Sequence, residues 1–344
     1  MNPHAWNLVG LKKPTKKSPK VMTTFACGGG PSLGYKLAGC DVVAANDIDP
    51  EMAWHYQHNL PPKHYFLCPI RDLLTQELPD DLFHLDILDG SPPCSTFSVV
   101  GEREKNWGKE KHFREGQAKQ VLSDLFFDYL DLVGHLKPKV AIAENVKGML
   151  VANARSCVNM IVERFQEIGY RVQVFLVNAA DCGVPQCRER VFFCAIRDDI
   201  QAPKLVLQPK EKWVSAGEAC SGIQELTQAE VANTRVPAHD RWWGLCKKGS
   251  SYAKLKVTGG NYFSWSRLDD AKPSPTLVSR TAQGPAHWDE CRALTFREWK
   301  RLGSFPDDCV AKTDALGKYL VGMSVPPKMM AYIAREVAHQ WLGV

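Results

Sequence analysis

Several features that define other classes of protein are missing from this sequence. The longest clean apolar stretches, such as residues 191–196, are far too short to span a bilayer. The basic N-terminus is not followed by the apolar region and cleavage site of a secretory signal. No G-x-x-x-x-G-K-[ST] sequence occurs, which excludes a P-loop nucleotide site. We therefore expect a cytoplasmic protein with no membrane partner.

The chain has 12 cysteines but no Cys-x-x-Cys pair. The closest relevant spacings are Cys182-x4-Cys187 and Cys187-x6-Cys194, which do not favour a structural zinc site. We therefore predict no bound metal and a reducing compartment. Most of these cysteines are expected to be small hydrophobic residues of the core.

Acidic residues are absent from two basic runs, although the net charge is only +5. Residues 1–22 hold five lysines, and residues 241–256 hold Arg241, Lys247, Lys248, Lys254 and Lys256. Such concentrated charge indicates a polyanionic partner. For residues 1–20 we predict a flexible basic arm.

Short apolar runs alternate with helix-length periodic segments through the first part of the chain. This alternation predicts an α/β fold with a mostly parallel, doubly wound sheet. The expected strands are residues 21–26, 42–45, 85–88, 140–143, 172–177 and 191–196, and the expected helices include 121–136, 158–168 and 327–342.

The pattern changes from about residue 197, where Pro, Gly, Ser and Trp become frequent and the alternation ends. We therefore predict a main domain over residues 21–197, completed by a C-terminal helix at 320–344. Residues 198–319 are expected to form a second, smaller and irregular domain.

The first expected strand leads into Gly28, Gly29 and Gly30, and a helix follows. Such a turn allows close backbone approach to a ligand, and the helix N-terminus favours an anionic group. Asp47, at the end of the second strand, is placed to bind ribose hydroxyls. An adenosine-type cofactor and a purely structural turn both stay open, and so do NAD and S-adenosylmethionine.

Cys94 lies in the stretch Gly90-Ser91-Pro92-Pro93-Cys94, directly after a predicted strand. Ligands of open α/β sheets bind at the carboxyl ends of strands. The two prolines fix the backbone and hold the thiol in one direction. A free thiol has a pKa of about 8.5, so an active Cys94 needs activation by its surroundings.

Two further candidates follow or precede strands. Glu144, in Glu144-Asn145-Val146, is an acid at a strand's carboxyl end, where catalytic residues gather. Alternation places Gln186, Arg188 and Arg190 on one face, where three donors would suit a phosphate or a base edge. A solvated edge strand is the alternative for this second segment.

Six motifs, in family order and with compatible spacing, resemble those of the DNA cytosine-5 methyltransferase family of bacterial or phage type. They cover most of residues 21–344. They are Phe25-Ala26-Cys27-Gly28-Gly29-Gly30, Gly90-Ser91-Pro92-Pro93-Cys94 with Phe97-Ser98, Glu144-Asn145-Val146, Gln186-x-Arg188-x-Arg190, Arg292-Ala293-Leu294-Thr295-Phe296-Arg297-Glu298 and Gly322-Met323-Ser324-Val325-Pro326-Pro327.

The resemblance implies a Rossmann-like sheet that binds S-adenosylmethionine, with residues 198–319 as a target-recognition domain. It implies that the Cys94 thiolate attacks C6 of a cytosine flipped out of duplex DNA, so that C5 accepts the methyl group. Glu144 would donate to N3 of the base, and Arg190 with Arg188 would hold its carbonyl. For the loop of residues 99–119, which holds three glycines and many charges, a lid that closes over the DNA and a merely solvated loop both stay open.

The resemblance also assigns binding residues. Expected contacts to the cofactor are Phe25, Gly28, Gly29, Gly30, Asp47, Ile48, Ile70, Pro93, Leu125, Met323, Ser324 and Val325. Expected contacts to DNA are Gln186, Ser98, Arg241, Lys247, Lys248, Lys254 and Lys256. We also expect a monomer and a cognate restriction endonuclease as a functional partner.

Several positions depart from the family pattern. Cys27 replaces a glycine, Asp47 replaces a longer glutamate, and Pro69 replaces the aspartate that binds the adenine amine. Ser95 and Met323 replace a glutamine and an asparagine that would flank the methyl donor. We therefore predict a weakened or roomier cofactor pocket.

Other functions remain to be weighed. A tRNA methyltransferase of the same architecture has a reduced recognition segment, whereas roughly ninety residues separate the fourth and fifth motifs here, which favours duplex DNA. A non-catalytic DNA-binding member would not need Cys94, Glu144 and Arg190 together. An NAD-dependent oxidoreductase leaves Pro92-Pro93-Cys94 unexplained.

Overall fold

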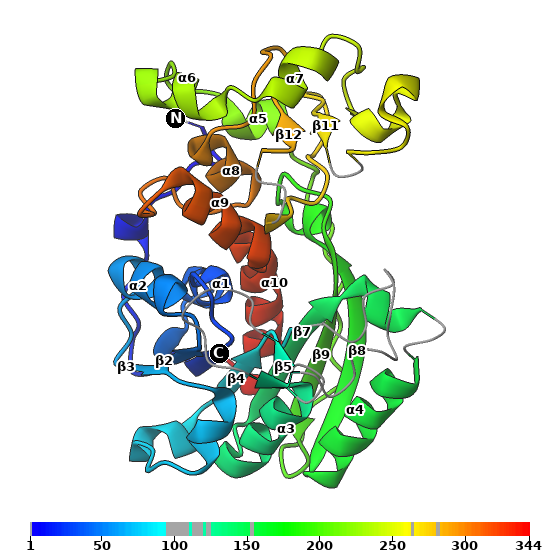
Figure 1. Cartoon of the computed structure of the whole chain (residues 1–344). Helices are drawn as coiled ribbons and strands as arrows, with labels where there is room; N and C mark the ends of the chain where they lie inside the picture. Colours follow the sequence, from blue (N-terminus) through cyan, green and yellow to red (C-terminus); the bar gives the residue numbers. More distant parts are fainter. Residues whose placement is uncertain are drawn as a thin grey trace. The chain divides into compact units, whose positions relative to one another are not determined.

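The chain forms two compact units in the computed structural model, which describes residues 2–93, 110–111, 120–121, 125–151, 155–262, 265–279 and 283–344. The sheet unit comprises Lys12–Val177, Glu189–Pro209 and Met330–Val344. The mixed unit comprises Met1–Leu11, Asn178–Arg188 and Lys210–Met329. Each unit is therefore assembled from segments that lie far apart in the sequence (Figure 1).

A seven-stranded sheet in the order β3-β2-β1-β4-β7-β9-β8 forms the centre of the sheet unit. Its strands are β1 (Lys20–Thr24), β2 (Asp41–Asp47), β3 (His64–Leu67), β4 (Ile87–Gly90), β7 (Val140–Val146), β8 (Tyr170–Asn178) and β9 (Glu189–Arg197). The pairs from β3 to β7 are parallel, and β9 runs antiparallel to β7. The predicted α/β fold with a mostly parallel sheet is confirmed. A separate hairpin pairs β5 (Glu110–Lys111) with β6 (Gln120–Val121).

The chain order changes direction at β1, which lies between β2 and β4. Thr24 at the end of β1 pairs with Gly90 at the end of β4, and Gly90 pairs with Ala143 of β7. The segments that follow these three strands therefore leave the same edge of the sheet side by side. In open α/β sheets this switch point is where ligands bind.

Helices cover both faces of the sheet (Figure 1). They are α1 (Gly30–Leu37), α2 (Pro50–Asn59), α3 (Leu125–Leu136), α4 (Arg155–Glu167) and α10 (Pro327–Val337). Side chains of α3 and α4 form an apolar core with Met22, Leu88 and Ala141. The next residue, Asp89, points to the opposite face, where Tyr35 of α1 contacts it. The predicted helix at 121–136 begins only at Leu125, since Val121 lies in β6.

The mixed unit consists of short elements, as its composition predicts. Its helices are α5 (Ala216–Cys220), α6 (Gln228–Thr234), α7 (Pro237–Trp242), α8 (Phe296–Leu302) and α9 (Asp314–Met323), and its small sheet joins β10 (Ser250–Ser251), β11 (Ser266–Arg267) and β12 (Pro285–Ala286). A buried ion pair between Arg292 and Glu298, 2.9 Å long, fixes the start of α8. None of the helices within the described ranges is long and apolar enough to cross a membrane.

Residues 2–8 are not the flexible arm that the sequence predicts. The Asn2 amide donates to the carbonyl oxygens of Glu218, Ala219 and Ser221 at 2.9–3.0 Å. The Trp6 indole donates to Ser304 O at 3.0 Å. Asn2 thus donates hydrogen bonds to carbonyl groups at the end of α5 that have no donor within the helix. The composition of the sequence does not reveal this contact.

The observed borders of the units also differ from the expected domains. Residues 178–188 belong to the mixed unit, because Gln186 bridges to Ser274 and the Cys187 amide donates to Ser274 O at 2.8 Å. The expected C-terminal helix at 320–344 is two helices, α9 and α10, separated by Ser324, Val325 and Pro326.

Gly90 gives a test of the packing at the edge of the sheet. A Cβ at this position would lie 2.5 Å from Tyr129 Cε2, and the Tyr129 hydroxyl is held 2.9 Å from the carbonyl oxygens of Leu88 and Ile142. We expect Gly90→Ala to lower the free energy of unfolding by about 1–3 kcal/mol. Urea unfolding of the full chain measures this loss.

Gly134→Ala, inside α3, is the matched control. A Cβ at Gly134 would lie 3.6 Å from Ile168 Cγ2, which is an ordinary van der Waals distance. This variant should be neutral or gain up to about 1 kcal/mol. Equal behaviour of the two variants would contradict the packing argument.

Candidate active site

The turn after β1 adopts a backbone that few residues tolerate. Phe25 and Cys27 have φ values of 52° and 47°, and Gly29 has a φ of 91°. A Cβ at Gly29 would lie 2.6 Å from Leu60 Cδ1, so this position requires glycine. Strain at non-glycine residues is typical of ligand-binding turns. The turn delivers the chain into α1, whose first amide groups have no intrahelical acceptor.

Asp47 holds this turn from the end of β2. Its Oδ2 accepts from the Cys27 amide at 2.7 Å, and its Oδ1 accepts from the Asp49 amide at 2.8 Å. Burial raises the pKa of Asp47, and these backbone hydrogen bonds oppose the shift. The carboxylate at the end of β2 thus holds the backbone of the turn.

Other predicted cofactor residues lie in different surroundings. Phe25 packs against the core, which also contains Ile70 and Leu125. Ile48 and Pro93 are partly exposed. The last-motif residues Met323, Ser324 and Val325 belong to the mixed unit instead.

Within the mixed unit, the last motif ends α9. Met323 is 48% exposed, and its sulfur accepts from Ser279 Oγ at 3.2 Å. Ser324 is buried, and its hydroxyl donates to Leu320 O at 2.8 Å. The contact that Ser324 makes here is thus a helix cap.

Cys94, Ser95, Ser98 and the predicted lid of residues 99–119 lie outside the described residues, except for the two residues of β5. The segment that leads to Cys94 is described as far as Pro93. The Asn145 side-chain amide donates to Pro92 O at 3.1 Å, and this bond is buried. β7 therefore holds the backbone before the predicted nucleophile, a role that the sequence did not reveal.

Glu144 and Arg190 lie together. Arg190 Nε is 3.0 Å from Glu144 Oε1, and both side chains are almost buried. Arg190 Nε forms no hydrogen bond with any group among the described residues, because the angles to Glu144 are unfavourable. The pair is therefore held by charge, and both groups keep hydrogen-bonding capacity for a ligand. The joint role predicted for them in binding the base stays a prediction.

Gln186 and Arg188 do not share the face of Arg190 as predicted, because β9 begins only at Glu189. Gln186 is buried, and its Oε1 accepts from the Leu277 amide at 3.2 Å. The buried Arg188 guanidinium donates to Leu277 O and Gly322 O, each at 3.1 Å. These contacts lie within the mixed unit and hold both side chains in place, while the contacts predicted for Gln186 to DNA and for Arg188 to the base stay predictions.

Asp89 is a titratable group that the sequence analysis missed. It is buried in β4, where its Oδ1 accepts from the Tyr35 hydroxyl at 3.0 Å. Its Oδ2 is buried without a hydrogen-bond partner in the described part of the chain. Burial raises the pKa of Asp89 to about 8, with a further contribution from the charge of Glu144, while the Tyr35 hydrogen bond lowers it. An acid inside the apolar run Ile87-Leu88-Asp89-Gly90 was the available signal.

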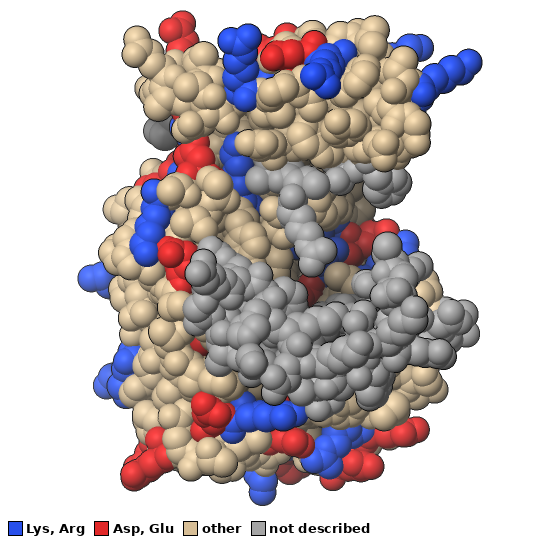
Figure 2. All heavy atoms as spheres, in the orientation of Figure 1, with Lys and Arg blue, Asp and Glu red and all other residues tan. Residues whose placement is uncertain are grey.

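The basic run of the mixed unit is exposed in part as predicted. Arg241, Lys247, Lys254 and Lys256 are exposed, whereas Lys248 pairs with Asp270 at 2.8 Å and Asp289 at 2.7 Å. Figure 2 shows basic and acidic side chains interspersed on the surface of this unit.

Tryptophans of the same run serve packing. Arg267 stacks 3.7 Å over the ring of Trp243, whose indole donates to His287 O at 2.7 Å. Trp243 is thus held by protein contacts within the mixed unit.

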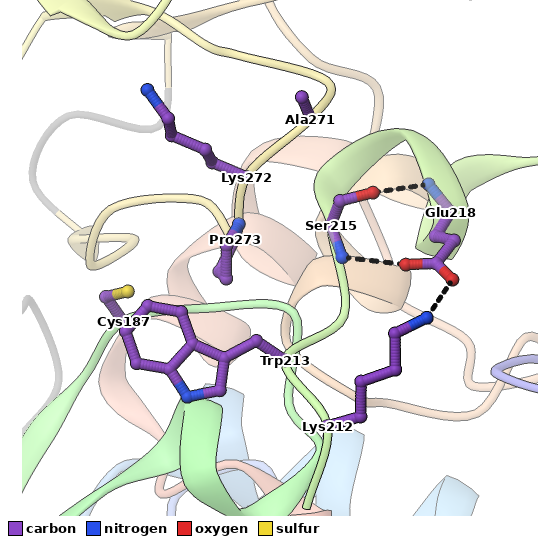
Figure 3. Close-up of a pocket in the computed structure, with 8 residues that line it drawn as sticks. All are labelled: Cys187, Lys212, Trp213, Ser215, Glu218, Ala271, Lys272 and Pro273. Atoms are coloured by element: carbon purple, nitrogen blue, oxygen red, sulfur yellow. Dashed lines mark hydrogen bonds and ion pairs between the residues drawn. The ribbon is translucent and has the colours of Figure 1, made fainter.

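A pocket of about 520 Å³ lies within the mixed unit (Figure 3). Its lining residues are Cys187, Lys212, Trp213, Ser215, Glu218, Ala271, Lys272 and Pro273. Trp213 is 49% exposed, and its indole donates to Asp181 at 2.7 Å. Lys212 pairs with Glu218 and Lys272 with Asp269, so the pocket offers a polyanion no net attraction. No cluster able to hold a metal ion occurs among the described residues.

Comparison with known proteins decides the family. The sequence profile described as "C-5 cytosine-specific DNA methylase" matches residues 20–339. The chain belongs to this family. Its fold also resembles a prophage protein of Escherichia coli described as a DNA modification methyltransferase, with a TM-score of 0.71, 21% identity and coverage of 95% of this chain and 100% of that one.

Two curated relatives are Type II methyltransferases. M.FnuDI of Fusobacterium nucleatum is 34% identical over 92% of this chain and 94% of its own length. M.NgoFVII of Neisseria gonorrhoeae is 29% identical over 94% of this chain and 87% of its own length. As a member of the family, the chain is an S-adenosylmethionine-dependent enzyme that methylates C5 of cytosine in DNA. The tRNA methyltransferase alternative is not favoured.

The buried acid gives a prediction about pH. The folded chain holds the Asp89 proton up to about pH 8. An aspartate in the unfolded chain loses its proton near its ordinary pKa of about 3.9. Because the folded state binds the extra proton, this group lowers the free energy of unfolding as pH rises from about 4 to 8.

Asp89→Asn removes this dependence while keeping the acceptor for Tyr35. The stability of the variant relative to the native chain should rise across this pH range by a few kcal/mol, on the order given by the shift. Urea unfolding at several pH values measures it. A pH-independent difference would show that Asp89 is not protonated in the folded chain.

Proposed function

We propose that the chain methylates a cytosine flipped out of a specific duplex DNA sequence, with Cys94 as the covalent nucleophile. The proposal rests on the topology of the sheet. Gly90, four residues before Cys94, pairs with Thr24 before the glycine turn and with Ala143 before Glu144. The cofactor turn and the Cys94 segment therefore follow two adjacent strand ends, and Glu144 lies within β7 directly after the residue that pairs with Gly90.

Cys94 adds to C6 of the base, and its S–C6 bond makes C5 nucleophilic. Glu144 donates to N3 and thereby relieves the charge that develops on the ring. Arg190 holds the base carbonyl and, with its charge beside Glu144, fixes the acid. Once C5 carries the methyl group, a base or a water molecule accepts the C5 proton, the C–H electron pair restores the C5–C6 double bond, and the S–C6 bond breaks to release the Cys94 thiolate.

S-adenosylmethionine, when bound, supplies the methyl group. Asp47 holds its ribose, while the turn of Gly28, Gly29 and Gly30 allows close backbone approach. The dipole of α1 favours its carboxylate. The remaining predicted contacts are Phe25, Ile48, Ile70, Pro93, Leu125, Met323, Ser324 and Val325.

The mixed unit reads the DNA in this proposal. Its exposed residues Arg241, Lys247, Lys254 and Lys256 contact phosphates, which position the protein on the duplex. Type II relatives support a cognate restriction endonuclease as functional partner. We further propose that the protein acts as a monomer in the cytoplasm of a bacterium, or from a phage gene.

Methyl transfer to alternative substrates tests the function. With labelled S-adenosylmethionine, we expect incorporation into duplex DNA and not into tRNA. Cys94→Ser should abolish incorporation, because the hydroxyl is too weakly acidic to add to C6. Cys291→Ser is the control, since Cys291 is exposed in the mixed unit. Incorporation into tRNA alone would contradict the proposal.

Cofactor affinity tests the role of Asp47. Calorimetry with S-adenosylhomocysteine should show roughly tenfold weaker binding by Asp47→Asn, since both the turn and the ribose lose a charge-assisted hydrogen bond. Exposed Asp80→Asn is the control. We expect the native chain to bind weakly in the absence of DNA, because of the replacements at Cys27, Pro69 and Met323. Sub-micromolar binding without DNA would contradict the weakened pocket.

A further inference from the structure

A second ion pair lies beside Glu144 and Arg190. Lys147 Nζ is 2.9 Å from Glu189 Oε1 and 2.8 Å from Glu189 Oε2, so one ammonium group contacts both oxygens. Lys147 follows the last residue of β7, and Glu189 is the first residue of β9. The pair therefore joins the two strands where their ladder ends, at the pair Val146 and Arg190.

The backbone of Glu189 also holds Arg190. Arg190 Nη1 donates to Glu189 O at 2.7 Å, while its Nε lies 3.0 Å from Glu144. One guanidinium is thus fixed between the backbone next to it and the acid on β7. Glu189 and Arg190 are joined by a peptide bond and by this hydrogen bond. Any movement of Glu189 away from β7 would therefore move Arg190 with it.

We propose that Lys147 and Glu189 are positioning residues that hold Arg190 against Glu144 for methyl transfer. The inference rests on the proposed roles of Glu144 and Arg190 in binding the base. Lys147 touches neither of them in an ion pair. It acts through the side chain of Glu189 and the strand end that carries Arg190.

The Lys147–Glu189 pair contributes little to the free energy of unfolding, because both side chains are partly exposed. Its side chains are 53% and 44% exposed, and an exposed ion pair contributes only about 0–1 kcal/mol to stability. A rate is more sensitive, because a displacement of about 1 Å at reacting groups costs up to about a hundredfold. The pair should therefore affect turnover much more than folding.

An exposed lysine could also contact a DNA phosphate directly, and charge reversal separates the two roles. We compare Lys147→Met, Glu189→Gln and the double variant that carries Lys147→Glu with Glu189→Lys. The double variant restores an ion pair with its charges exchanged, but it places an acid where a phosphate contact would need a base.

Lys139→Met is the matched control. Lys139 precedes β7 and pairs with Asp86 at 2.8 Å, and its side chain is 53% exposed, as that of Lys147 is. It tests whether loss of any exposed ion pair beside β7 lowers turnover. Thermal unfolding of each variant checks that the chain is folded.

We expect Lys147→Met and Glu189→Gln to lower kcat for DNA methylation by roughly three- to tenfold, with KM for DNA unchanged. The double variant should recover kcat to within about twofold of the native chain, and Lys139→Met should match the native chain.

Three results would overturn the inference. Native kcat in both single variants would show that the pair has no positioning role. A raised KM in Lys147→Met, made worse by the double variant, would show a phosphate contact. An equal loss of kcat in Lys139→Met would show a general effect on the strand. A native chain that does not methylate DNA would instead overturn the proposed function itself.

Discussion

Parallel pairing of β1 with β4, and of β4 with β7, is the constraint on which the site depends. Backbone hydrogen bonds fix the ends of these strands against one another, so the residues that follow them start from adjacent points. The cofactor turn, the Pro-Pro-Cys segment and the Glu144 motif share no local sequence. They share an edge of the sheet. Gly90 shows how closely that edge is packed, because Tyr129 and Thr24 fill the space that a side chain would need.

The same edge concentrates buried acids, which a protein can hold only with hydrogen bonds, paired charges or protons. Each kind of compensation is present. Asp47 is held by two backbone amides, Glu144 by the charge of Arg190, and Asp89 by a raised pKa with one hydrogen bond from Tyr35. Only Glu144 is assigned to the chemistry. Asp47 holds the turn after β1, and Asp89 accepts a hydrogen bond from Tyr35 of α1. The Lys147–Glu189 pair extends this arrangement to the solvent-exposed end of the ladder.

The sequence predicted the strands of the sheet except β3, the order of the motifs and the glycine turn, because these depend on local alternation and on residue types at fixed spacing. It failed where a distant segment supplies the partner. The sequence did not show that Leu277 and Gly322, which lie far along the chain, accept hydrogen bonds from Arg188. Asn2 looked like part of a loose arm for the same reason. The proton on Asp89 was hidden because it follows from burial, which no short motif records.

The central claim is that Cys94, and not another of the 12 cysteines, reacts at this edge of the sheet. Duplex DNA that carries 5-fluorocytosine at the target position tests it, since fluorine at C5 blocks the proton loss that releases the thiol. Incubation with S-adenosylmethionine should trap a covalent protein–DNA complex, and mass spectrometry of its peptides should place the adduct on Cys94. The account would be contradicted by a complex attached at any other cysteine, or by no complex with DNA that the native chain methylates.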